Sequence, residues 1–134
     1  MRSVEVEVDT SGKLVTNVTE RVRVFAEQTG DDGLVHVFVP HATAGVTLME
    51  TGSGSEEDLV ELFGRILPRD DRYMHSHGAA GHGGDHLLPA MVGPALTLPV
   101  DGGRLILGTW QSVVIVDPNH ENNVRRLRLS FLAG

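Results

Sequence analysis

Short strand-like segments follow one another along this chain with only two helical stretches among them, and that pattern constrains the fold more than any other feature. Valine alternates with acidic residues at 4–8, and leucine and phenylalanine alternate with polar residues at 127–131, the period of half-buried strands. Five more runs are β-branched, apolar or extended, at 34–39, 41–50, 95–100, 104–108 and 110–116. Because these seven segments are mostly neighbours in sequence, we expect an antiparallel α+β domain rather than a parallel doubly wound sheet.

The two helical stretches are marked by apolar stripes and by residues typical of helix ends. Asn17 stands three residues before Glu20, a spacing like that of a capping box, and Gly30 can close the first helix in a left-handed conformation. We expect Ser55 to cap the second helix, which ends before Pro68. The stripes are Val18, Val22, Phe25 and Ala26 in the first helix, and Leu59, Leu62, Phe63 and Ile66 in the second.

Composition excludes several classes of function. The chain of 134 residues fits one domain, 1–134, and no run of eighteen apolar residues offers a membrane span. A net charge of −7 and an aromatic content of 4% argue against binding to nucleic acid or to an anionic membrane. Cysteine is absent and the N-terminal segment lacks the pattern of a signal peptide, so we expect a cytoplasmic protein.

A segment rich in glycine and histidine, 69–85, shows no periodicity and is expected to be a long loop. It contains His75, His77 and His82, and His86 follows it directly. His75 and His77 point the same way in an extended segment, whereas His82 and His86 would share one face of a helical turn. A short helical turn is also expected at 87–92. Either pair could supply two imidazole ligands to a divalent metal. The alternative is a flexible surface loop in which histidine is merely tolerated.

The segment 40–50 is a second candidate. His41 comes just beyond a buried strand and is followed by Thr43 and a glycine, an arrangement that suits the rim of a pocket. Glu50 could act as a general base or as a ligand. An edge strand with surface threonines and a solvated Glu50 is the competing interpretation.

The third candidate is the segment Thr109-Trp110-Gln111, where the only tryptophan lies beside hydrogen-bonding side chains. A buried core tryptophan with its indole N–H satisfied is the commoner explanation of such a residue. Arg125, with its neighbours Arg126 and Arg128, could hold a phosphate. Alternation instead favours a solvated strand face for Arg126 and Arg128.

Several segments together resemble the YjbQ family, whose members are described as secondary thiamine-phosphate synthase enzymes. The resemblance covers nearly the whole chain, and the combination of motifs is specific. The matching stretches are Pro40-His41-Ala42-Thr43-Ala44-Gly45 through Glu50, Tyr73-Met74-His75, Asp85-His86-Leu87-Leu88-Pro89-Ala90-Met91-Val92-Gly93-Pro94, Leu98-Pro99-Val100 and Gly102-Gly103-Arg104-Leu105-Ile106-Leu107-Gly108-Thr109-Trp110-Gln111.

The resemblance implies a β-sandwich-like α+β fold, a homotrimer and a small pocket in which the family's histidines bind a metal ion. His75 and His86 are the implied ligands and His41 and Glu50 the implied catalytic pair. His82 departs from the family's usual asparagine and adds a ligand, whereas His77 lies in a variable loop and is an expected bystander. Asp85, where alanine is usual, would orient an imidazole. Substrate contacts are expected from Thr43, Thr109, Trp110 and Gln111.

The implied reaction joins a pyrimidine diphosphate to a thiazole phosphate and releases pyrophosphate, so a small phosphorylated metabolite is the expected substrate. Such chemistry needs a cation beside the leaving group. Imidazole ligands favour zinc, whereas enzymes acting on diphosphates usually hold magnesium through carboxylates. We therefore expect zinc, with magnesium as the alternative. A non-catalytic metal- or metabolite-binding trimer and a zinc-dependent hydrolase are the competing functions.

Overall fold

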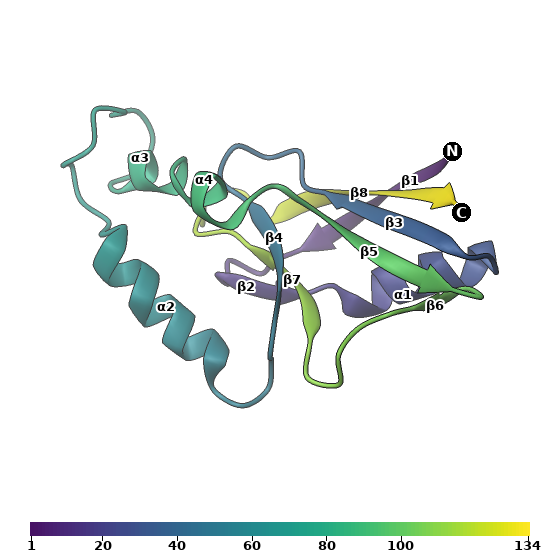
Figure 1. The fold of residues 1–134 in the computed structure, drawn as a ribbon. Helices are drawn as coiled ribbons and strands as arrows, with labels where there is room; N and C mark the ends of the chain where they lie inside the picture. The colour runs from purple at the N-terminus through teal and green to yellow at the C-terminus, as the bar shows by residue number, and fades with distance from the viewer.

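Two antiparallel sheets form the body of the molecule in the computed structural model, which describes all 134 residues (Figure 1). The larger sheet has the strand order β1-β8-β3-β5-β6. Its strands are β1 (Arg2–Asp9), β3 (Gly33–Phe38), β5 (Ala95–Asp101), β6 (Arg104–Leu105) and β8 (Val124–Ala133). The smaller sheet has the order β2-β7-β4, from β2 (Val15–Asn17), β4 (Gly45–Met49) and β7 (Ser112–Val116). Every strand pair is antiparallel, which confirms the predicted α+β class.

Two long and two short helices complete the fold. They are α1 (Thr19–Thr29), α2 (Ser55–Ile66), α3 (His82–Asp85) and α4 (Leu88–Val92). α1 packs against the large sheet, whereas α2, α3 and α4 gather at the other end of the molecule, beside the small sheet (Figure 1). No helix has the length and apolar character that crossing a bilayer would require.

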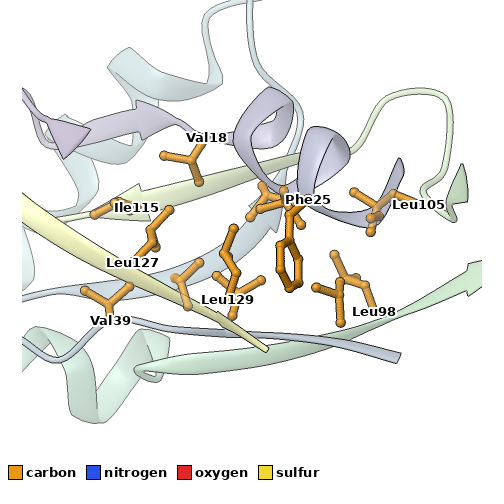
Figure 2. Close-up of a cluster of buried hydrophobic side chains, with 14 of the residues drawn as sticks. Val18, Phe25, Val39, Leu98, Leu105, Ile115, Leu127 and Leu129 are labelled. Atoms are coloured by element: carbon orange, nitrogen blue, oxygen red, sulfur yellow. The ribbon is translucent and has the colours of Figure 1, made fainter. Parts of the chain in front are cut away.

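The main core lies between α1, the inner face of the large sheet and one face of the small sheet. All four stripe residues predicted for α1 are buried, and Gly30 ends the helix with a φ of 68°. Figure 2 shows Val18 and Phe25 of this helical region facing Leu127, Leu129 and Leu98 of the large sheet. The alternation of residues in β8 and β3 therefore sets which face of each strand meets α1.

The second predicted helix is present, but its stripe is only partly buried. Phe63 is buried, whereas Leu62 and Ile66 are about half exposed. Ser55 is the first helical residue instead of the cap, and Gly54 occupies the cap position with a φ of 100°. The capping-box expectation at Asn17 is also wrong in detail, because Asn17 Oδ1 accepts from the backbone and side chain of Thr19 and Glu20 plays no part.

Three strand predictions were too long. The predicted strand 104–108 stops at Leu105, and 110–116 begins only at Ser112. In 41–50, a turn occupies the first residues and the strand is confined to β4. β2 was not predicted, because its three residues are too short to show a period.

Candidate metal centre

Four histidines converge where α3 meets the preceding loop. One ligand nitrogen from each of His75, His77, His82 and His86 can be chosen so that all four lie within 4.8 Å of one another. The ring centroids of His75 and His86 are 4.4 Å apart, and those of His82 and His86 are 4.7 Å apart. The structure thus brings together the three predicted ligands and includes His77, which had been expected to stand aside.

Glycines allow the loop to pack this tightly against α3. A Cβ on Gly83 would lie 2.5 Å from the carbonyl oxygen of His75, and one on Gly84 would lie 2.7 Å from the ring of Tyr73. The Tyr73 hydroxyl donates to the carbonyl of Pro68 at 2.7 Å and anchors the loop. Glycine at these positions therefore serves close packing that brings His75 beside His82 and His86.

Hydrogen bonds define the orientation of His86. Its Nδ1 lies 3.3 Å from the carbonyl oxygen of Ala42, which can only accept, so the proton belongs on Nδ1. In the neutral ring Nε2 then carries a lone pair. This Nε2 points into the cluster and lies 3.0 Å from Nε2 of His82.

Neither neutral tautomer of His82 gives complementary partners to both of its ring nitrogens. Its Nδ1 is buried, makes no hydrogen bond of good geometry and lies 3.4 Å from the Glu121 carboxylate. With the proton on Nδ1, the ring presents a lone pair to the lone pair of His86. With the proton on Nε2, a buried lone pair faces the carboxylate instead. Either arrangement costs free energy, because buried polar atoms without complementary partners are unfavourable.

His75 and His77 form the exposed side of the cluster, beside a polar cavity of about 220 Å³. Partial desolvation lowers the pKa of His75 from its ordinary value, and the neighbouring His77, His86 and His82 lower it further. A lower pKa keeps the His75 imidazole neutral, the form in which it can act as a ligand.

His41 lies in a separate polar network. Arg125 donates from Nε to Asp117 at 2.6 Å and from a terminal nitrogen to Thr43 at 3.2 Å. Thr43 in turn donates to Asp117 at 2.8 Å. His41 Nε2 accepts from the backbone N–H of Arg126 at 2.9 Å, and its Nδ1 is 3.5 Å from the Arg125 guanidinium. Burial and the Arg125 cation lower the pKa of His41, although Asp117 opposes them.

The remaining predicted residues lie elsewhere. Glu50 follows β4 at the end where Met49 pairs with Ser112, and about 16 Å of strand separates it from the histidine end. Thr109, Trp110 and Gln111 belong to the loop at that same far end, where Gln111 accepts from the N–H of Gly108. Trp110 is 74% exposed, so the alternative of a buried core tryptophan is wrong.

Asp85 does not orient an imidazole as expected. Its buried carboxylate instead forms an ion pair with Arg69, and a second contact between the two side chains is 3.2 Å long. The partner of His82 is instead Glu121, and His86 uses a backbone carbonyl. Of the three arginines, Arg126 and Arg128 are exposed as the alternation indicated, whereas Arg125 is buried.

Sequence reasoning missed Glu121, Asp117 and the Ala42 carbonyl. The sequence predicts no functional role for the segment 117–119. A single Asp before a proline carries no sign of a buried partner eight residues on, so only the folded chain reveals the Arg125–Asp117 pair.

Comparisons with known proteins agree with this architecture. A family model described as "UPF0047 protein YjbQ-like" matches residues 4–134. A UPF0047 protein of Mycobacterium tuberculosis is 58% identical over 128 residues, covering 96% of this chain and 96% of the relative. A hypothetical protein of Aeropyrum pernix has a crystal structure that matches with a TM-score of 0.90 at 30% identity, covering 100% of both chains.

A Sulfolobus solfataricus structure, called a YbjQ-like protein of unknown function, matches the fold with a TM-score of 0.90 at 23% identity, covering 99% of this chain and 97% of that chain. The expected YjbQ-like fold is therefore confirmed. With the family model spanning nearly every residue, the chain belongs to the YjbQ-like UPF0047 family.

Proposed function

We propose that this chain is a metal-dependent enzyme that holds a zinc-type cation with His75, His82 and His86 and acts on a small phosphorylated metabolite. The observation that carries the proposal is the 3.0 Å approach of two Nε2 atoms whose rings are directed by Ala42 and Glu121. A cation bound by both lone pairs removes the conflict and leaves each Nδ1–H facing an acceptor.

The donor set fits zinc better than magnesium. Zn–N bonds of about 2.0–2.1 Å place tetrahedral ligand nitrogens about 3.3 Å apart, close to the His82–His86 separation. The cluster contains only imidazoles, whereas magnesium prefers oxygen ligands. Three imidazoles leave an open position for catalysis, so we assign His77 to the rim and expect His77→Ala to retain the ion.

Such an ion supplies a Lewis acid that neutralises a phosphate leaving group or activates water. The chain's own contribution is orientation. Ala42 and Glu121 direct His86 and His82, and the glycines of α3 let His75 approach them. His41 Nε2 already accepts from the Arg126 N–H, so its proposed catalytic role requires exchange of that N–H for substrate.

Two reactions fit this centre. The family resemblance points to joining a pyrimidine diphosphate and a thiazole phosphate. The all-imidazole donor set favours a second candidate, hydrolysis of a small phosphate or carboxylate ester, because this ligand type is common where zinc activates water.

Metal binding is tested on purified protein at pH 8, treated with chelator and reloaded with one equivalent of zinc or cobalt. We expect one bound ion by elemental analysis and the visible absorption of tetrahedral cobalt. His82→Ala and His86→Ala should lose the ion, whereas His36→Ala, a matched exposed histidine on β3, should keep it. Unchanged binding in both cluster variants would contradict the proposal. The alternative to a metal ion is a doubly protonated His82, which would donate to His86 Nε2 and to the Glu121 carboxylate. In that case the wild type binds no zinc at pH 8.

Activity is tested with the reloaded protein. Release of pyrophosphate from the two thiamine precursors supports the transferase, and turnover of p-nitrophenyl phosphate or acetate supports the hydrolase. Either activity must disappear in His86→Ala. A reloaded protein with neither activity would favour a non-catalytic metal-binding role.

We further propose that the chain assembles as a homotrimer in which the far-end loop of one copy reaches the histidines of its neighbour. Within one chain Glu50 and Trp110 cannot reach them, and an exposed tryptophan is typical of an interface. The single tryptophan gives a direct readout. Its emission should shift to the blue with concentration as trimers form, and a monomer at all concentrations would contradict the assembly.

A further inference from the structure

A cavity of about 480 Å³ lies between α2 and the chain segments 12–15 and 118–120. Its walls are apolar, with Val60 and Phe63 from α2 and Leu67 just beyond its end facing Leu14, Val15 and Leu88. None of the four clustered histidines lines it. The volume falls within the range of sites that bind small molecules.

Gly64 lines this space from the last turn of α2. Glycine is among the least favourable residues inside a helix, and no left-handed backbone at this position requires it. A Cβ built on Gly64 would meet nothing within 4 Å. A larger residue would therefore be tolerated sterically and would favour the helix, yet it would fill the cavity. Glycine here keeps the space open.

The charges around the cavity are divided between its ends. One end of the cavity holds three basic residues, Lys13, Arg69 and His120. Arg69 donates to the carbonyl of Pro118, and the His120 ring bonds the carbonyl of Gly12, which precedes Lys13. The Arg69 guanidinium is already paired with Asp85, whereas Lys13 forms no ion pair. Glu56 and Glu57, in the first turn of α2, lie at the opposite end.

We propose that this cavity binds a small amphipathic monocarboxylate, with its apolar body along Phe63 and Gly64 and its carboxylate at Lys13. A second anionic group at the far end of the ligand would meet Glu56 and Glu57. The site therefore discriminates against dicarboxylates of the same length. This site is separate from the metal centre, since none of the four clustered histidines lines the cavity.

Decanoate is the probe, with decanol and decanedioate as matched analogues, and binding is followed by calorimetry on the full chain. We expect decanoate to bind more tightly than either analogue. Lys13→Met should weaken decanoate about tenfold, as for the loss of one charge-assisted contact, while leaving decanol unchanged. Equal losses for both probes would overturn the assignment of the carboxylate to Lys13.

Gly64→Leu tests the cavity itself. The variant should remain folded by circular dichroism, melt no lower than the wild type and lose decanoate binding by more than tenfold. Leu62→Ala, on the exposed face of α2, is the control and should bind as the wild type does. Undiminished binding by Gly64→Leu would overturn the proposal. So would a wild type that binds no decanoate but buries α2 against another copy in a concentration-dependent oligomer, because a second copy would then be the occupant.

Discussion

Two polar regions adjoin the Ala42 backbone, and they differ in how fully their buried polar atoms are hydrogen-bonded. In the buried network of Arg125, Asp117 and Thr43, each side chain has found complementary partners. In the histidine cluster, Nδ1 of His82 is buried without a hydrogen bond, and two Nε2 atoms face each other.

The difference separates structural from functional polar groups. A network of paired charges lowers the cost of buried charge and fixes the neighbouring backbone, because its members are committed to one another. An unsaturated cluster is retained at a cost in stability, and such cost is typical of a site that a ligand completes. The same chain segment, 41–43, connects the two, because Thr43 belongs to the network and the Ala42 carbonyl directs His86.

Breaking the network should have the largest effect on stability. Arg125→Met leaves Asp117, only 1% exposed, as an uncompensated buried charge, and should cost about 3–5 kcal/mol in urea unfolding. Arg128→Met is the control, because its pair with Glu5 is about half exposed and should contribute less than about 1 kcal/mol.

The folded fraction of Arg125→Met should lose less zinc affinity than His86→Ala does. If Arg125→Met were as stable as the wild type, or had no zinc affinity when folded, the network could not be called structural and the cluster functional.

Binding of zinc to the histidine cluster should have the next largest effect on the unfolding free energy, and it should increase it. Zinc at 100 times its dissociation constant should raise the unfolding free energy by about 2.7 kcal/mol, because it binds only the folded arrangement. Chelator should reverse the gain, and His86→Ala should show none. An equal gain in that variant would mean that zinc binds elsewhere.

Much of the fold could be predicted because its cause is local. The α1 stripe has a helical period, and Gly30 is placed where a left-handed residue ends the helix. The spacing of His82 and His86 likewise places both rings on one face of a turn. In α2 the same type of stripe predicted burial that Leu62 and Ile66 do not have, because a period indicates a helix face but not what covers it.

The rest of the site depends on distant parts of the chain. His41 and Glu50 belong to one motif, yet β4 lies between them and holds them apart. Arg125 meets Thr43 across 82 positions of sequence, and Glu121 meets His82 through a loop packing that no local pattern encodes. Spacing thus indicated two separate histidine pairs, whereas their convergence in one cluster and the partners of their rings were not predictable from it.

The smallest effect tests whether His41 belongs with the saturated region. Its Nε2 accepts from the Arg126 N–H, so protonation there breaks a hydrogen bond and places a second cation beside Arg125. Burial and Arg125 lower the pKa of His41 in the folded chain. The unfolded chain therefore binds more protons just below the ordinary histidine pKa, and stability should fall as pH decreases from about 6.5 to the lowered value.

His41→Gln can keep an acceptor for Arg126 without titrating. In urea unfolding between these pH values, this variant should show a flatter dependence of stability on pH. A slope unchanged in His41→Gln would assign the acid sensitivity to other groups and leave His41 free for the catalytic role proposed for it.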